Sequence, residues 1–268
     1  TGTGIEGRMP MVAAMPMSRS SGIARFAAVP GVLSFVFIWF GKGWKRYLWI
    51  IPLLFFGWII YIMQSRGAVI GFCFVIAFEM LFLGGRKRTI AIFFLLLFGV
   101  ALVSNAIPGK LFEDVSSYMR RGQSVEEFRS MTGRTYYWKL AWPKILEAPI
   151  VGRGFQADRS VAKGHVHNTY LYVLLTAGFT GGLVFVVGLV WSWLLFFLAL
   201  KKSDSFDPKH KIFLIQAGGI LAFFTIRGIT EVSGGLFNVD FMVMLPIMTY
   251  LGALDQRYSL TKKLKVVW

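Results

Sequence analysis

Hydrophobic residues occur along most of this chain in long runs that short polar connections separate. A hydrocarbon core about 30 Å thick is crossed by roughly 20 helical residues, and about 17 is the minimum. Runs of this length predict transmembrane helices. The chain has seven of them, at 23–40, 47–63, 68–83, 89–106, 168–200, 211–229 and 241–254.

The fifth segment, 168–200, is too long for one straight span and too short for two. Glycines at 178, 181 and 182 can interrupt it, because glycine adopts backbone conformations that break a helix. We therefore expect a short half-helix, 168–177, followed by one full span.

The longest polar stretch is the loop 107–167, which separates the fourth and fifth segments. After Gly133-Arg134, apolar side chains recur at three- and four-residue steps, which predicts a helix inside the loop. Pro143 should kink this helix, and Pro149 should end it. The apolar positions are Tyr137, Leu140, Ala141 and Ile145.

Composition supports a membrane protein. The residues are 56% hydrophobic and 16% charged, whereas a soluble domain is usually about half apolar and about a quarter charged. The net charge of +16 would suggest a nucleic-acid partner in a soluble protein. Here the basic residues separate apolar runs, as membrane topology requires, so nucleic acid is not expected. The single cysteine, Cys73, excludes a disulfide framework. These features predict an all-α, polytopic transmembrane protein.

Basic residues mark one set of connections. The opposite connections hold little beyond Arg66 and Arg227, so the positive-inside rule makes the basic side cytoplasmic. The loop 107–167 is then extracytoplasmic, the N-terminal segment lies outside and the C-terminus inside, in agreement with an odd number of crossings. The basic residues are Lys42, Lys45, Arg46, Arg86, Lys87, Arg88, Lys201, Lys202, Lys209, Lys211, Arg257, Lys262, Lys263 and Lys265.

The chain begins at Thr1, and its first residues lack the basic start and apolar stretch of a signal peptide. We expect a single membrane domain, 1–268, that forms the C-terminal part of a longer protein with further spans upstream.

Two arginines on the predicted outer side are candidates for anion binding. Arg66 lies at the outer edge of the third segment, where the positive-inside rule disfavours arginine; it either binds an anionic group or snorkels to the interface. Arg134 lies at the start of the predicted loop helix, where backbone N–H groups favour an anion and a guanidinium offers a planar fork for phosphate. A solvated loop arginine is the alternative.

Two of the three histidines, His165 and His167, lie just before the half-helix. Histidine can act as a general base near neutral pH. A metal site is not expected, because two histidines at this spacing give at most two ligands and no nearby cysteine or acidic cluster completes a zinc set. Asn168 is a candidate N-cap, and a plain capping or surface role is the alternative for this motif.

Other charged residues receive simpler predictions. Arg25 is expected to face a buried site, and Arg153 to make a loop contact. Arg227 and Glu231 bracket the outer end of the sixth segment and are predicted to pair with each other. Glu79 lies in the third segment near its cytoplasmic end, where snorkelling would explain it.

Four short motifs lie in order along the predicted outer face. They are Ser65-Arg66-Gly67-Ala68; Gly133-Arg134 followed by Trp138; Pro149-Ile150-Val151-Gly152-Arg153-Gly154-Phe155; and His167-Asn168 followed, after nine residues, by Gly178-Phe179-Thr180-Gly181. Together they resemble sequence elements of the O-antigen ligase and polymerase superfamily. The resemblance covers about 18–182, while the last spans agree only in hydropathy.

This resemblance implies a fold like that of the GT-C membrane glycosyltransferases. It also implies inverting, metal-independent transfer from an undecaprenyl diphosphate-linked glycan, without a cofactor, at the periplasmic face of a bacterial inner membrane. Arg66 and Arg134 would hold the diphosphate, and His167 would activate the acceptor hydroxyl. Further substrate-binding candidates are Arg25, Arg153, His165, Asn168 and Tyr170.

Three functions remain open from the sequence. A ligase would move a finished glycan onto lipid A–core, whereas a polymerase would extend a growing polysaccharide by the same chemistry. The third is a transporter or non-catalytic membrane subunit. Its sequence signature would be charged residues buried at mid-membrane, and the spans show almost none. For either enzyme, the site is expected where the loop 107–167 meets the bilayer.

Overall fold

A computed structural model of the chain describes residues 20–63, 65–82, 134–160, 164–232 and 239–266. All regular secondary structure in these ranges is helical, which confirms the all-α prediction. The fourth predicted segment, 89–106, and part of the loop, 107–133, lie outside the described residues.

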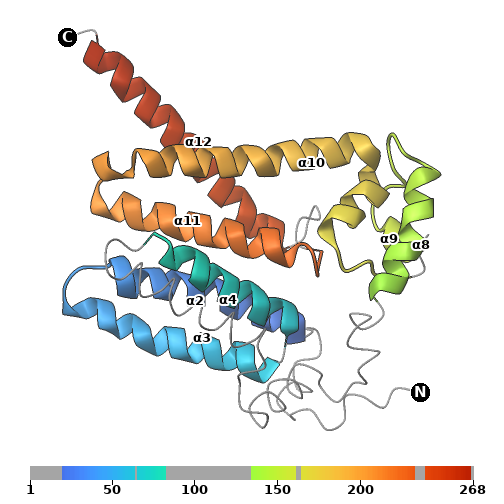
Figure 1. The fold of residues 1–268 in the computed structure, drawn as a ribbon, viewed down its shortest axis with the longest axis horizontal. Coiled ribbons are helices and arrows are strands. Elements are labelled where there is room, and N and C mark those ends of the chain that lie inside the picture. Colours follow the sequence, from blue (N-terminus) through green and yellow to red (C-terminus); the bar gives the residue numbers. More distant parts are fainter. Residues whose placement is uncertain (1–19, 64, 83–133, 161–163, 233–238, 267–268) are drawn as a thin grey trace, which may run out of the picture.

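Long apolar helices lie side by side, and α12 crosses them obliquely (Figure 1). Among the described residues, four helices are long and apolar enough to cross a membrane, and α4 and α12 contain shorter apolar helices. The protein is therefore a multi-pass membrane protein, and six of the predicted segments are helices. Their bounds are α2 (Ser20–Phe40), η1 (Trp44–Trp49) with α3 (Ile50–Met63), α4 (Arg66–Met80), α10 (Thr169–Lys201), α11 (Pro208–Arg227) and α12 (Val239–Val266).

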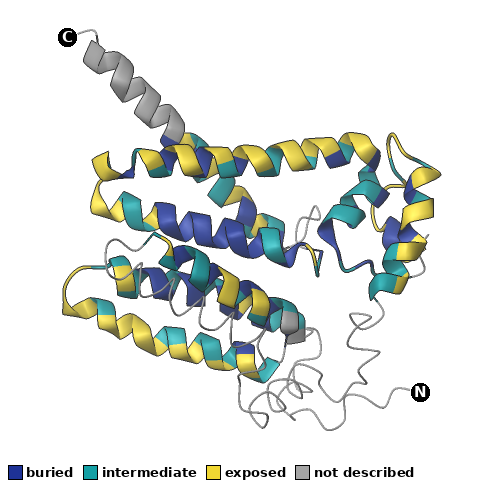
Figure 2. Cartoon of the chain, in the orientation of Figure 1, coloured by how far each residue is buried: buried dark blue, intermediate teal, exposed yellow. Residues whose placement is uncertain are grey.

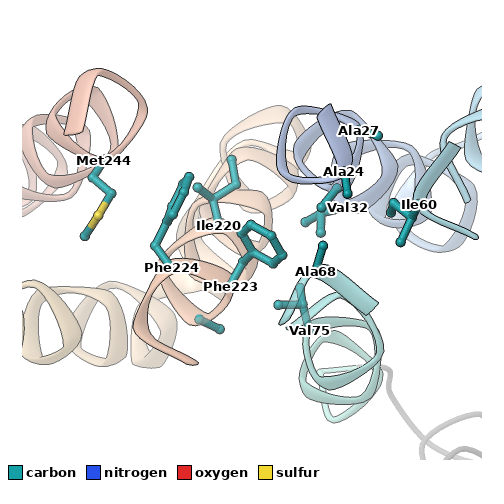
Figure 3. Packing of buried hydrophobic residues seen from close by; sticks show 12 residues of the cluster. Ala24, Ala27, Val32, Ile60, Ala68, Val75, Ile220, Phe223, Phe224 and Met244 are labelled. Atoms are coloured by element: carbon teal, nitrogen blue, oxygen red, sulfur yellow. The ribbon is translucent and has the colours of Figure 1, made fainter. Parts of the chain in front are cut away.

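Helix α11 is the centre of the bundle. It packs against α2, α4, α10 and α12, and it is buried along most of its length (Figure 2). Its Phe223 points toward Val32 of α2 and Ala68 of α4 (Figure 3). Small residues allow this approach: a Cβ built on Gly71 of α4 would come within 3.0 Å of the Phe223 ring. The edge helix α3 packs mainly on α2 and leaves large apolar side chains exposed to lipid.

Glu79 of α4 does not snorkel. Its exposed fraction is 0%, and neither carboxyl oxygen has a hydrogen-bond partner among the described residues. The prediction is wrong because α4 turns this face toward α11, where a Cβ on Gly219 would lie 2.1 Å from Oε1 of Glu79. The spans therefore bury an acidic residue that their sequence alone did not indicate.

Helix α10 is broken at Gly178, where φ is 65°. The prediction of a half-helix followed by a full span is confirmed. The segment 149–154 closes the break, since four backbone hydrogen bonds join the two segments. They are Arg153 N–H to Leu175 O, Gly154 N–H to Thr176 O, Phe179 N–H to Pro149 O and Thr180 N–H to Ile150 O. Such closure matters because lipid cannot satisfy free backbone groups.

Helices α8 (Arg134–Leu146) and α9 (Ala157–Ser160) lie across one end of the bundle (Figure 1), and the short 3-10 helix η2 (Ser203–Ser205) connects α10 to α11. Helix α8 ends at Leu146, before Pro149, as predicted; Pro143 lies inside it, and the kink there stays a prediction. The half-helix and the segment after α11 lie at this same end. The basic connections 41–49 and 201–208 lie at the opposite end.

Candidate functional site

The segment 228–232, which follows α11 and is called the outer turn below, organises the candidate site. Its successive carbonyl groups hold two other elements. The carbonyls of Gly228 and Ile229 accept the N–H of Thr169 at 2.7 Å and the side-chain amide of Asn168 at 3.0 Å. The carbonyl of Thr230 accepts Arg134 at 2.6 Å. The half-helix and α8 are thereby fixed to the end of the most buried helix.

Glu231 of the outer turn joins two of the predicted site residues. Its Oε1 accepts a hydrogen bond from Arg134 at 2.9 Å, and its Oε2 lies 3.1 Å from Nδ1 of His167. Only 15% of the Glu231 side chain is exposed. Burial by itself would raise the pKa of Glu231, but the hydrogen bond with His167 and the charges of Arg134, His167 and Arg227 bring that pKa below its ordinary value. Glu231 is therefore anionic at neutral pH.

His167 is held in an unusual backbone conformation, with φ at 45°. A non-glycine residue in this region stores strain of about 1–3 kcal/mol and persists only where its surroundings fix it. Both neighbours of His167 are fixed. The carbonyl of buried Val166 accepts Nε1–H of Trp138 at 2.7 Å. Asn168 caps the half-helix, as predicted, by accepting the N–H of Leu171 at 2.9 Å.

The imidazole of His167 remains accessible, since 28% of its side chain is exposed. A ring that is oriented on one side and open on the other can take a proton from a bound substrate.

His165 lies beside His167, with ring centroids 4.3 Å apart. Its Nδ1 accepts the backbone N–H of His167 at 3.1 Å. Since a backbone N–H can only donate, the proton of the neutral His165 ring is on Nε2. Burial, and then the charge of His167, lower the pKa of His165, so it is a neutral neighbour at neutral pH. His165 therefore supports the backbone of His167 without adding charge.

Arg134 begins α8, as the motif predicted. Its guanidinium is not that of a solvated loop arginine, because it bonds the carbonyl of Thr230 and the carboxylate of Glu231 at once. Two N–H groups of Arg134 serve these bonds, and a guanidinium has five.

Arg66 begins α4, and its side chain lies outside the described residues. The backbone beside it is well placed, since a Cβ on Gly67 would lie 2.9 Å from Oγ1 of Thr230. The Ser65-Arg66-Gly67-Ala68 motif therefore lies against the outer turn, at the same residue, Thr230, whose carbonyl accepts the hydrogen bond from Arg134.

The prediction that Arg227 pairs with Glu231 is wrong. Arg227 bonds Oδ2 of Asp240 at 3.1 Å, and Nε of Arg25 lies 2.8 Å from Oδ1 of the same carboxylate. The reason is that α11 ends at Arg227, so the chain turns Glu231 away toward Arg134 and His167. Arg25 does face a buried group, because Asp240 is 1% exposed.

Two other predicted residues serve the scaffold. The hydroxyl of Tyr170 donates to the carbonyl of Thr225 at 3.1 Å and ties the half-helix to α11. Arg153 pairs with Glu147 and donates to the carbonyl of Lys144 at 3.1 Å, in the loop that closes the helix break. Their role in substrate binding stays a prediction. Within the described ranges, no three histidine, cysteine or acidic side chains are grouped as metal ligands.

Sequence reasoning missed Glu231 as the partner of His167 and Asp240 as the partner of two arginines. The available signal was chemical: both are acidic residues at the ends of apolar segments, where arginines also occur. Their partners could not be assigned, because they are far away in the sequence.

The fold and site define a polytopic helical membrane protein with a His–Glu–Arg cluster at one end of its bundle. The sequence model of the O-antigen ligase family matches residues 51–186, about half of the 268 residues. The chain therefore belongs to the O-antigen ligase family and is a membrane glycosyltransferase of the ligase or polymerase type. A search of curated proteins found no match.

The matched region contains all four motifs, together with α4, α8, α9, all but the first residue of α3 and the first part of α10. Glu231 and Asp240 lie beyond it. Glu231 contacts two motif residues, Arg134 and His167. Asp240 instead pairs with Arg25 and Arg227, which also lie outside the matched region.

Proposed function

We propose that the protein transfers a glycan from undecaprenyl diphosphate to an acceptor hydroxyl at the periplasmic face of a bacterial inner membrane. The transfer inverts the anomeric centre and needs no metal. The observation that carries this proposal is the placement of His167 and Arg134 on the two carboxylate oxygens of Glu231, at the end of the bundle opposite the basic connections (Figure 1).

The donor diphosphate would lie at the membrane edge, where its lipid tail enters the hydrocarbon and its anion meets the outer turn. Arg134 has donors left after bonding the turn, and Arg66 begins a helix whose first residues pack on Thr230. Both are therefore assigned to the diphosphate.

The arginines act most strongly in the transition state. As the glycosidic bond breaks, negative charge develops on the leaving diphosphate. Fixed guanidinium groups stabilise this charge more than they stabilise the ground state, which lowers the barrier. The positive charges of these guanidinium groups provide the stabilisation that a divalent cation would otherwise supply.

His167 is the general base. The acceptor O–H bond breaks and its proton moves to the imidazole, while the acceptor oxygen bonds to the anomeric carbon. The bond from that carbon to the diphosphate breaks, and its electron pair leaves on the diphosphate. Attack from the face opposite the leaving group gives inversion. A positioned base typically contributes about 10²–10⁴-fold.

The orientation follows from charge. The connections 41–49 and 201–208 carry lysines and an arginine and lie at one end, so the positive-inside rule assigns that end to the cytoplasm. The outer turn then faces the periplasm, where a flipped lipid-linked glycan and its acceptor are both found.

The acceptor separates ligase from polymerase. The site chemistry is common to both reactions and does not identify the acceptor. We assign lipid A–core as the acceptor, because the family description names a ligase. Purified lipid-linked glycan is offered to the protein in nanodiscs, together with lipid A–core or with further lipid-linked glycan. The proposal expects glycan on lipid A–core, at a rate that exhaustive chelation leaves unchanged. A lengthened lipid-linked chain would mean a polymerase, and no transfer to either acceptor would remove the enzymatic proposal.

A further inference from the structure

A histidine that accepts a proton must present an unprotonated nitrogen to the substrate. Neutral imidazole has one N–H and one lone pair, and the partner of the first nitrogen decides which is which. For His167 that partner is Glu231, 3.1 Å from Nδ1.

An ionised carboxylate can only accept hydrogen bonds. Oε1 of Glu231 already accepts from Arg134, and Oε2 faces Nδ1 of His167. The proton of the neutral ring must therefore be on Nδ1, which leaves the lone pair on Nε2.

We infer that Glu231 is the positioning residue of the base: it fixes the proton on Nδ1 of His167, and Arg134 holds Glu231 in place. This inference rests on the proposed function. Glu231 does not touch the reacting atoms; it sets the tautomer of the residue that does. After the acceptor proton arrives on Nε2, the carboxylate also faces the imidazolium and stabilises its charge.

The chain of contacts is anchored at both ends. Arg134 is bonded to the carbonyl of Thr230 as well as to Glu231, so its guanidinium cannot follow a moving carboxylate. Thr169 donates its hydroxyl to the carbonyl of Glu231 at 2.8 Å, which fixes the backbone of the acid to the half-helix that follows His167. The carboxylate of Glu231 therefore positions both the base, His167, and the diphosphate-binding Arg134.

This arrangement predicts an informative result for Glu231→Gln. Arg134 offers only donors, so the new amide must turn its oxygen toward Arg134 and its NH₂ group toward His167. That NH₂ group donates to Nδ1 and moves the ring proton to Nε2, where it blocks proton acceptance. We expect kcat to fall about 10²–10⁴-fold, the range for loss of a positioned base, while KM for the donor is unchanged.

The tautomer can be measured without turnover. Isotope-labelled histidine nitrogen NMR of the full protein in nanodiscs distinguishes the two tautomers, and His167→Gln identifies the His167 signals among the three histidines. Wild type should show Nδ1–H, and Glu231→Gln should show Nε2–H. Glu231→Asp keeps an acceptor-only group and should retain Nδ1–H with part of the activity. Glu147→Gln is the matched control, since Glu147 is an exposed acid that pairs with Lys144 and Arg153.

The outcomes separate this inference from the proposed function. Transfer that His167→Ala abolishes but Glu231→Gln leaves at the wild-type kcat would overturn the inference and leave the function standing. An Nε2–H tautomer in wild type, or the same tautomer in wild type and Glu231→Gln, would also overturn it. If wild type transfers no glycan, the proposed function fails, and the NMR result still decides whether Glu231 sets the tautomer.

Discussion

At the outer turn, charged side chains from distant helices lie enclosed and paired, whereas at the basic end, residues 41–49 and 201–211, they are largely exposed. Arg134 and Glu231 are 97 residues apart in the sequence, and Arg25 reaches Asp240 from the first described helix. At the basic end, Lys211 pairs with Asp204, whose side chain is 95% exposed. Among the described residues, the largely enclosed pairs lie at the outer end, whereas the Lys211–Asp204 pair of the basic end is open to water.

The charges at the two ends have different functions. Exposed lysines set the topology by their number and need no defined partner. Ionised side chains that are enclosed, such as Arg227 and Asp240, must be paired, because an isolated charge out of water is strongly destabilising. Positioned pairs of this kind are what a reaction at the membrane surface requires.

The largest effect is expected from Asp240→Ala. This change removes the carboxylate that Arg227 and Arg25 share, and removing one partner of a buried pair typically costs about 3–5 kcal/mol. Unfolding the purified protein in detergent, by heat or by denaturant, measures this loss of stability. A stability equal to wild type would mean that the outer-end pairs do not hold the helices together.

A smaller effect is expected from Gly152→Ala, which tests how the outer end closes the break in α10. Gly152 has φ of 69°, and a Cβ there would lie 2.4 Å from the backbone nitrogen of Gly178. Backbone must therefore move, and the left-handed conformation adds about 1–2 kcal/mol. Lower stability and slower transfer are expected together.

Two glycines serve as controls for Gly152→Ala. Gly154 has φ of 86° with open space around its Cβ position, so Gly154→Ala should show the conformational strain alone. Gly188 lies in the straight part of α10 with nothing within 4 Å, and Gly188→Ala should be neutral or stabilising by about 0.5–1 kcal/mol. Equal effects at all three positions would contradict the contact between the loop and the helix break.

The smallest effect is expected at the basic end. Lys211→Ala removes the ion pair with Asp204, and exposed pairs contribute little because water and salt screen them. The unfolding midpoint and the transfer rate should match wild type. A loss as large as that of Asp240→Ala would abolish the distinction between the two ends.

The fold was largely predictable because it follows from local pattern. Apolar run length gave the helices, and Gly178 marked the break in α10. The burial of Glu79 was not predictable, because it depends on how α4 is rotated against Gly219 of α11. Hydropathy along one segment contains no information about that rotation.

The sequence predicted which residues form the site, but not which of their side chains pair with each other. His167, Arg134 and Asn168 were found from short motifs, and the structure places all three at the outer turn. The role of Glu231 was missed because its nearest basic neighbour in sequence, Arg227, was the obvious partner. Pairing was decided by the end of α11, which directs the two side chains to different helices.

The most direct test of the central claim is single-turnover transfer by His167→Ala, with binding of the lipid-linked donor measured in the same nanodiscs. We expect donor binding equal to wild type, because the arginines remain, and transfer reduced by about 10²-fold or more, because the base is gone. Transfer at the wild-type rate would mean that His167 is not the base.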